Sequence, residues 1–205
     1  MGHEISISNV SKISGLTAEE ILDKMVEKKI GIAGSATSTT PGASGSGLLN
    51  GRLIAGETVE FDGIYWIVAH ADYVNRIAYL ASTILVTSTV FGSNTTYKGS
   101  TLATIAANFE KGMSEAALVK MKSVTQDGVT AKIFPPTHDQ ANGGWSYFST
   151  QANRICKLNG NDSWYWTSTA RSSGGVWSVG GDGGNGTYGS PGSAGGFRPC
   201  LALAL

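Results

Sequence analysis

The alternation of aromatic and polar residues is clearest near the C-terminus, in residues 161–171. Trp164 and Trp166 alternate there with Tyr165 and Thr167. Because successive side chains of a β-strand point to opposite faces, this order predicts a strand with both indoles on one, buried face. The smaller and more polar side chains are expected on the other face, exposed to solvent.

The segment that follows, residues 172–196, consists mostly of Gly and Ser. With so few apolar groups it cannot build a core of its own, so we expect it to lie on a scaffold as loops or to have no fixed structure. Large side chains scattered among small, flexible residues are also typical of the binding loops of antibodies. These side chains are Val176, Trp177, Val179, Asp182, Asn185 and Tyr188.

A different pattern occupies the first 50 residues. Residues 17–20, Thr-Ala-Glu-Glu, have the form of a capping box, which predicts a helix over about residues 18–29. Apolar side chains from Ile21 to Val26 recur at helical spacing and would form one stripe. Since an isolated helix of this length is marginal in water, the stripe needs a partner, either the rest of this chain or other chains. Residues 34–47 are rich in Gly, Ser and Thr, which is typical of a linker.

Residues 51–205 are expected to form the globular part of the chain. Alternating apolar residues around Asp62-Gly63 predict a β-hairpin over residues 57–69. For the apolar residues 77–86, periodicity leaves a strand and a buried helix both open. The other expected elements are helices over residues 101–111 and 114–122, divided by Gly112, with Ser114 as the cap of the second. A strand is expected over residues 129–134 and a closing strand over residues 197–205. Between them we expect a helix that starts at Asp139 or just after Gly144. This helix would carry Trp145, Phe148, Ala152, Ile155 and Cys156.

Length and charge narrow the class of protein. The 205 residues suffice for one domain of about 150 residues after an appendage of about 50. Fifteen basic and fifteen acidic residues cancel and no Lys/Arg cluster occurs, so neither nucleic acid nor an anionic membrane surface is an expected partner. The longest apolar stretches fall far short of the ~20 residues of a spanning helix, so no membrane insertion is expected. Export by a signal peptide is not expected either, because the N-terminus lacks a basic head and an apolar run.

Candidate catalytic and metal-binding residues are few. Cys156 and Cys200 have no second pair, which excludes a Cys-x-x-Cys zinc or redox motif and leaves two buried thiols or one disulfide open. His138 stands beside Asp139, but no nucleophile is spaced to join them, so the pair is interpreted as structural or solvated rather than catalytic. The three histidines are too scattered for a metal cluster, and residues 180–186 offer too few oxygen ligands for calcium. We therefore expect no cofactor, no metal and no enzymatic activity.

Four segments carry a family resemblance: residues 56–68 (GETVEFDGIYWIV), 97–102 (YKGSTL), 164–168 (WYWTS) and 196–203 (GFRPCLAL). In this order they resemble C-type-lectin-fold domains of bacterial surface proteins and phage structural proteins, including the variable proteins of diversity-generating retroelements. The resemblance covers residues 53–205. It implies an α+β fold, with a C-type-lectin-like domain at 51–205 and a short helical N-terminal appendage at 1–50.

The resemblance also implies a function. In the retroelement-linked members, adenine-directed mutagenesis rewrites chosen codons near the C-terminus, and the fold exposes the altered side chains as a ligand-binding face. This chain lacks the Glu-Pro-Asn or Gln-Pro-Asp motif of a lectin-type calcium site. The paired active-site cysteines of the formylglycine-generating enzymes, which share this broad fold, have no counterpart in it either.

Ligand-binding residues are expected on the polar side of the C-terminal strand and on the segment after it, because Tyr, Trp and Arg dominate interface energies where they reach a partner. Trp164 and Trp166 are expected in the core, while Trp177 is as compatible with packing against its valine neighbours as with binding. Arg198 is expected to be a structural anchor whose guanidinium ties loop carbonyls together. The candidate ligand-binding residues are Tyr165, Thr167, Thr169, Arg171, Trp177, Asp182, Asn185 and Tyr188.

Together these features predict a receptor-binding protein, an adhesin, on the tail or capsid surface of a phage virion. Its N-terminal segment is expected to form a homotrimer or to dock onto other virion proteins, and its C-terminal face to bind a bacterial surface receptor, either protein or glycan. A virion released by lysis needs no export signal, which favours the phage over a secreted protein. A bacterial surface or secreted adhesin and a structural virion decoration protein remain the alternatives.

Overall fold

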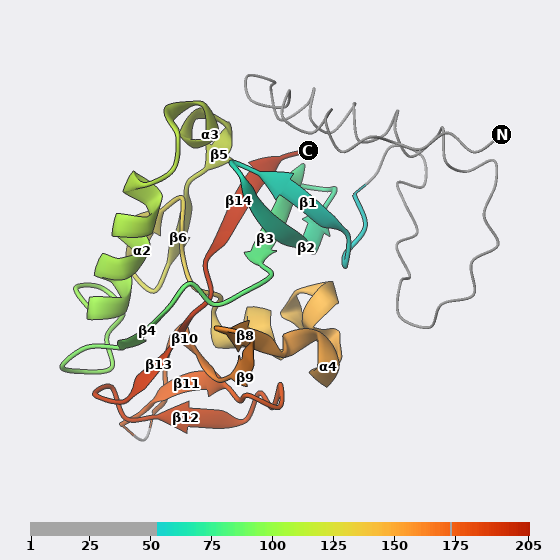
Figure 1. Ribbon diagram of the computed structural model, residues 1–205. Coiled ribbons are helices and arrows are strands. Elements are labelled where there is room, and N and C mark those ends of the chain that lie inside the picture. The colour runs from blue at the N-terminus through green and yellow to red at the C-terminus, as the bar shows by residue number, and fades with distance from the viewer. Residues whose placement is uncertain (1–52, 173) are drawn as a thin grey trace, which may run out of the picture.

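Two five-stranded sheets contain most of the strands of this protein (Figure 1). The computed structural model describes residues 53–172 and 174–205. Strands predominate over helices in this part, and the expected α+β class is confirmed. The helix expected over residues 18–29, the linker over 34–47 and the trimer contacts expected of that segment lie outside the described residues.

The first sheet has the strand order β1-β2-β3-β14-β5, and all its neighbours are antiparallel. The hairpin expected around Asp62-Gly63 is confirmed: these residues have φ angles of 54° and 73°, a left-handed conformation that suits a tight turn. The C-terminal strand lies between β3 and β5 and pairs Cys200 with Ala81. The strands are β1 (Thr58–Phe61), β2 (Ile64–Asp72), β3 (Ile77–Ser82), β5 (Met121–Lys122) and β14 (Cys200–Ala204).

The second sheet has the order β12-β11-β10-β13-β4, with β10 and β13 parallel and the other neighbours antiparallel. The expectation that residues 172–196 hold only loops is wrong, because three of these strands lie within or overlap them. Val176 and Val179 are buried, so β10 and its neighbours supply the core that the segment cannot build alone. The strands are β4 (Thr87–Val90), β10 (Tyr165–Ala170), β11 (Val176–Val179), β12 (Thr187–Gly189) and β13 (Ala194–Phe197).

Two helices lie along one side of the molecule in Figure 1, α2 (Thr101–Lys111) and α3 (Glu115–Lys120). The predicted cap at Ser114 is confirmed, and Ser100 caps α2 in the same way: each hydroxyl accepts a hydrogen bond from the backbone N–H of the residue three positions later. The Asp62 carboxylate in turn accepts from the backbone N–H and the hydroxyl of Ser114, at 2.9 and 2.6 Å. The first hairpin is thereby fixed to the start of α3.

The single helix expected between Asp139 and Cys156 is wrong. Three short helical turns occupy this region, because Gly143 adopts a φ of 96° and Thr150 is extended, which interrupts a continuous helix. Cys156 instead begins a strand, and the strand expected over 129–134 ends at Ala131. The turns are η3 (Gln140–Gly144), η4 (Ser146–Ser149) and α4 (Gln151–Arg154), and the small hairpins are β6 (Val124–Gln126) with β7 (Val129–Ala131) and β8 (Cys156–Leu158) with β9 (Asn161–Ser163).

A shared core joins the two sheets to α2. Phe109 of α2 makes edge-to-face contacts with Trp66 of the first sheet and Phe197 of the second, with ring centroids 6.5 and 6.3 Å apart. Trp166 is fully buried, as expected, while Trp164 is only partly buried and packs edge-on against it at 4.7 Å. The indole pair is therefore one buried ring and one ring at the margin of the core.

The chain crosses from the second sheet to the first at Arg198. This residue is 2% exposed, and its Nε donates a hydrogen bond to the Ser82 carbonyl at 3.0 Å. A second nitrogen donates to the Arg154 carbonyl at 3.3 Å and to the Tyr165 hydroxyl at 3.1 Å. The expected anchoring role of Arg198 is confirmed, since it binds two carbonyls from separate segments.

Cys156 and Cys200 are both free and buried, so of the two open alternatives the structure has thiols rather than a disulfide. Burial raises the pKa of both thiols above the ordinary value of 9.0. Burial also raises the pKa of the Tyr165 hydroxyl to about 12. All three groups therefore stay neutral in the folded chain at pH values where they ionise in the unfolded chain.

The first prediction concerns Gly195 on β13. A Cβ there would overlap the Trp164 ring and lie 2.8 Å from Nε1 of Trp166, so Gly195→Ala is expected to lower the free energy of unfolding by about 1–3 kcal/mol. Gly192→Ala is the matched control, because a Cβ there meets nothing within 4 Å. Urea denaturation of both variants measures the difference. Equal stabilities would contradict the packing of Trp164 against β13.

The second prediction is a loss of stability in alkali. Because the folded-state pKa values of the thiols and of Tyr165 are raised, their contribution is complete below the unfolded pKa and is lost as pH rises from there toward the folded values. Above about pH 9 the free energy of unfolding should fall by up to about 1.4 kcal/mol per pH unit for each thiol that ionises only when unfolded. Denaturation with reductant should show a shallower decline for the Cys156→Ala/Cys200→Ala double variant. An unchanged slope would count against the burial of these thiols.

Candidate functional site

The two strands at one edge of the second sheet, β11 and β12, carry a pair of aromatic rings. Trp177 of β11 lies directly opposite Tyr188 of β12, so both side chains project from the same face of this hairpin. Tyr188 is 56% exposed and Trp177 is partly buried. A tyrosine so exposed on a paired strand is available to a partner without any change in the sheet.

Arg171 lies over both rings. Its guanidinium carbon is 3.7 Å from the ring centroid of Tyr188 and 5.4 Å from that of Trp177. The backbone of Arg171 is fixed by a hydrogen bond from its N–H to the Gly175 carbonyl at 2.8 Å, which closes the turn between β10 and β11. Within residues 53–172 and 174–205, the guanidinium makes no hydrogen bond or ion pair. Its donors are therefore held in position but remain unused.

His138, from a segment far away in the sequence, extends this stack. Its ring stacks on Trp177 with centroids 4.2 Å apart and an interplanar angle of 21°. Nε2 of His138 lies 3.0 Å from the Asn185 carbonyl oxygen, and the backbone N–H of His138 donates to the Thr169 hydroxyl at 3.1 Å. We call Arg171, Trp177, Tyr188, His138 and Asn185 the Arg171 cluster.

The loop before η3 and the loop between β11 and β12 meet at this cluster. The Asn185 side-chain amide donates to the side-chain oxygen of Asn142, which joins the β11–β12 loop to η3 itself. The expected pairing of His138 with Asp139 is loose, since the two side chains approach only to 3.9 Å and Asp139 is fully exposed. His138 instead supports Trp177, a contact that sequence spacing could not indicate because the two residues lie on separate segments.

The structure brings together five of the expected ligand-binding residues. Arg171, Trp177, Asn185 and Tyr188 belong to the Arg171 cluster, and Thr169 borders it through His138. Asp182 lies on the same loop as Asn185, and its carboxylate accepts from the Gly184 N–H at 2.8 Å and from the Gln151 side-chain amide at 3.4 Å. It is exposed and lies outside the cluster contacts.

The prediction that Tyr165 and Thr167 bind a ligand is wrong, because both side chains are fully buried and have no exposed surface. The face of β10 that was expected to meet solvent is covered by a second apolar cluster, in which Tyr165 packs with Leu85 and Cys156. The Tyr165 hydroxyl donates to the Arg154 carbonyl at 3.1 Å, and the Thr167 hydroxyl donates to the Trp177 carbonyl at 2.8 Å. On the buried side of β10, these two hydroxyls therefore fix the backbone that carries the site.

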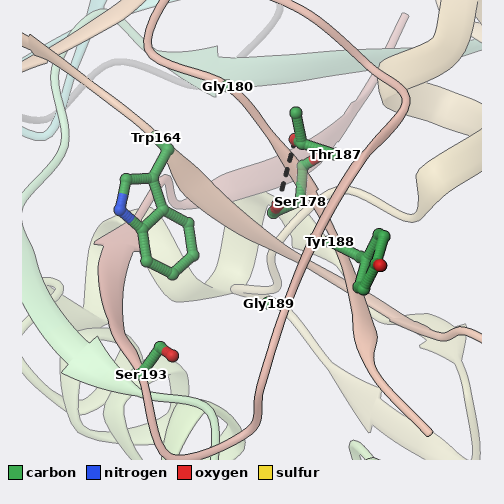
Figure 2. Close-up of a pocket in the computed structure, with 7 residues that line it drawn as sticks. All are labelled: Trp164, Ser178, Gly180, Thr187, Tyr188, Gly189 and Ser193. Carbon is green, nitrogen blue, oxygen red and sulfur yellow. Dashed lines mark hydrogen bonds between the residues drawn. The ribbon is translucent and has the colours of Figure 1, made fainter.

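A pocket of about 300 Å³ opens on the opposite face of the β11–β12 hairpin (Figure 2). Trp164 forms one wall, and the Ser178 and Thr187 hydroxyls, 3.1 Å apart, form another. Tyr188 also borders this pocket, although its ring projects away from Trp164. The sequence did not indicate this pocket, because Trp164 was expected in the core and not at the surface. The lining residues are Trp164, Ser178, Gly180, Thr187, Tyr188, Gly189 and Ser193.

The described residues contain neither a candidate metal site nor a membrane-spanning helix. Over the described ranges, no group of three or more His, Cys, Asp or Glu side chains is arranged to hold a metal ion. No helix in the same ranges has the length and apolar character needed to cross a bilayer. Comparisons with protein-family models, with curated proteins and with solved structures find no match to this chain. The function therefore has to be argued from the Arg171 cluster and the pocket themselves.

The third prediction compares two arginines that both contact aromatic rings. Arg171→Ala is expected to cost less than about 1 kcal/mol of stability, because it removes only a solvent-accessible cation–π contact. Arg198→Ala should cost more than about 3 kcal/mol. It leaves a cavity, and the buried carbonyls of Ser82 and Arg154 lose their hydrogen-bond donor. Urea denaturation of both variants is the measurement. Similar losses would contradict the assignment of one arginine to the surface and the other to the scaffold.

Proposed function

We propose that this protein is a non-enzymatic receptor-binding protein, an adhesin of a phage virion, that binds a bacterial surface receptor through the Arg171 cluster. The fold proposed for residues 51–205 is C-type-lectin-like. The N-terminal residues 1–50 are proposed to mount this domain, as a homotrimer or on other virion proteins. Codons of the exposed C-terminal residues are the ones proposed for retroelement diversification.

The observation that carries the proposal is the state of Arg171. Its guanidinium is held 3.7 Å from an exposed tyrosine ring, and its N–H groups have no partner in the part of the chain that the structure describes. Arg, Tyr and Trp are the side chains that contribute most to binding when they reach a partner. Because the stack already fixes their positions, binding loses less side-chain entropy than it would with free side chains.

The scaffold beneath the cluster supports a binding role as well. Thr167 and Tyr165 bind the carbonyls of Trp177 and Arg154, so the strands that carry the cluster are fixed from the buried side. Arg171 and Tyr188 can therefore be replaced without removing core packing, since neither side chain is buried. Such separation between a stable support and a replaceable face is what a diversified receptor-binding surface requires.

The proposed C-type-lectin-like fold rests on two further points. The four sequence segments occur in the order typical of that family. The closing strand β14 lies beside β3, next to the first hairpin, and the second sheet carries the Gly/Ser-rich segment. In Figure 1 the C-terminus follows β14 at the first sheet, away from β11 and β12, which leaves this hairpin free to face a receptor.

The fourth prediction tests receptor binding. Fluorescently labelled full-length protein is expected to stain some members of a panel of bacterial strains in flow cytometry. The Arg171→Ala/Tyr188→Ala variant should lose that staining while its thermal midpoint stays within a few degrees of the parent. Val119→Ser is the matched control: Val119 is 84% exposed on α3, which lies far from β11 and β12 in Figure 1.

Two outcomes would contradict the proposal. Undiminished staining by the double variant would place recognition outside the Arg171 cluster. An absence of staining on every strain would favour a structural decoration role, in which the exposed loops contact only neighbouring virion proteins.

A further inference from the structure

The pocket behind the β11–β12 hairpin is chemically distinct from the Arg171 cluster. Its residues alternate with Trp177 along the strands, so the two sites lie on opposite faces of the same hairpin. The lining contains one indole, one phenol ring, three aliphatic hydroxyls and two glycines but no charged side chain. A volume of about 300 Å³ lies at the lower end of the range for small-molecule sites and fits one small ring.

The hydrogen bonds of the pocket wall leave specific groups for a ligand. The Thr187 hydroxyl donates its only proton to the Ser178 carbonyl at 2.7 Å. The contact between the Thr187 and Ser178 hydroxyls at 3.1 Å must therefore use the proton of Ser178. Both protons are used, and only lone pairs of these two oxygens face the pocket, so this wall requires donors from a ligand.

Two other polar groups have no partner in the described chain. The side-chain hydroxyl of Ser193 and the indole N–H of Trp164 make no hydrogen bond with residues 53–172 or 174–205, whereas the indole N–H groups of Trp66 and Trp166 donate to carbonyls at 3.0 Å. A ligand that enters the pocket thus meets a hydroxyl wall, a free hydroxyl and the six-membered ring of Trp164, whose N–H lies on the side of the indole away from Ser178 and Thr187 (Figure 2).

We infer that this pocket binds one neutral sugar ring, such as a monosaccharide unit of a glycan. Sugar hydroxyls supply the donors that Thr187 and Ser178 require, and they accept from Ser193 as well. The C–H groups of the ring supply an apolar surface for the Trp164 indole. A charged ligand would lose its hydration without finding a counter-charge in this lining, and a pure hydrocarbon would leave the hydroxyls unsatisfied.

The glycines of the hairpin make room for this ring. A Cβ at Gly189 would lie 2.7 Å from the Trp166 ring and 3.5 Å from the Trp164 ring, so a larger residue would crowd the wall beside Trp164. At Gly180 a Cβ would meet the Asp182 carboxylate at 2.6 Å. The pocket is thereby a built feature of the sheet, and it stands whether or not the Arg171 cluster binds a receptor.

The test uses the full-length protein and three neutral sugars, glucose, galactose and N-acetylglucosamine. Saturation-transfer NMR should detect binding of at least one of them, and that sugar should shift the indole N–H signal of Trp164, identified by its loss in Trp164→Phe. Glucose 6-phosphate is the charged comparison and should bind more weakly than glucose.

Two variants locate the binding. Thr187→Val keeps the shape of the side chain but removes its hydroxyl, and it should weaken the affinity about tenfold, the equivalent of one lost hydrogen bond. Ser193→Ala should weaken it as well, and it decides the question alone if Thr187→Val does not fold. Ser190→Ala is the matched control, because Ser190 is exposed on the same turn but does not line the pocket.

The inference is overturned if none of the three neutral sugars shows saturation transfer. It is equally overturned if a bound sugar leaves the Trp164 signal unmoved, if the phosphorylated sugar binds more tightly, or if the affinity is unchanged in a folded Thr187→Val or Ser193→Ala variant. Loss of cell staining in the single Arg171→Ala variant with sugar binding retained would separate this pocket from the proposed receptor surface, because Arg171 does not line the pocket.

Discussion

A buried guanidinium holds the two sheets of this protein in place. Arg198 lies where the chain leaves β13 for β14, and it binds one carbonyl at the end of β3 and another at the end of α4. A buried charge is costly unless its hydrogen-bonding groups are satisfied, and carbonyls, the Tyr165 hydroxyl and the Phe148 ring surround this one. Lysine could not replace it, because the planar fork of donors reaches several separate acceptors at once.

The same network extends to the exposed loops. Arg154, whose carbonyl Arg198 binds, is itself buried and donates to the Gly183 carbonyl at 2.7 Å and to the Phe148 carbonyl at 2.7 Å. Gly183 has a φ of 80°, and a Cβ there would overlap the Gln151 carbonyl. A loop that reads as flexible in the sequence is thus fixed to the scaffold through two arginines. That fixation gives Asn185 and Tyr188 defined positions in the Arg171 cluster.

Local signals in the sequence account for the elements that were predicted well. Asp62-Gly63 specifies a tight turn, Ser100 and Ser114 cap helices through their own hydroxyls, and the apolar period of residues 101–111 matches one helix face. The anchoring role of Arg198 was also predicted, because the planar guanidinium of an arginine can bind several carbonyls at once.

What the sequence could not supply depends on contacts between distant segments. Tyr165 is buried because Leu85 and Cys156 cover it, and nothing near Tyr165 in the chain indicates that cover. The strands β11 to β13 form because β10 offers a hydrogen-bonding edge to a segment with little apolar content. His138 joins the candidate site by stacking on Trp177 across a wide gap in sequence, so composition identified the correct loop but only part of the site.

The central claim is that the hairpin of β11 and β12, supported from below by Arg198 and Arg154, is the surface that meets a partner. Hydrogen–deuterium exchange of the full-length protein, free and bound to envelope fragments of a strain that it stains, measures this directly. The account predicts that added protection concentrates in residues 169–188 and in the loop around His138, with the first sheet unchanged. Protection centred on the β1–β2 hairpin or α3, with the β11–β12 hairpin unchanged, would contradict it.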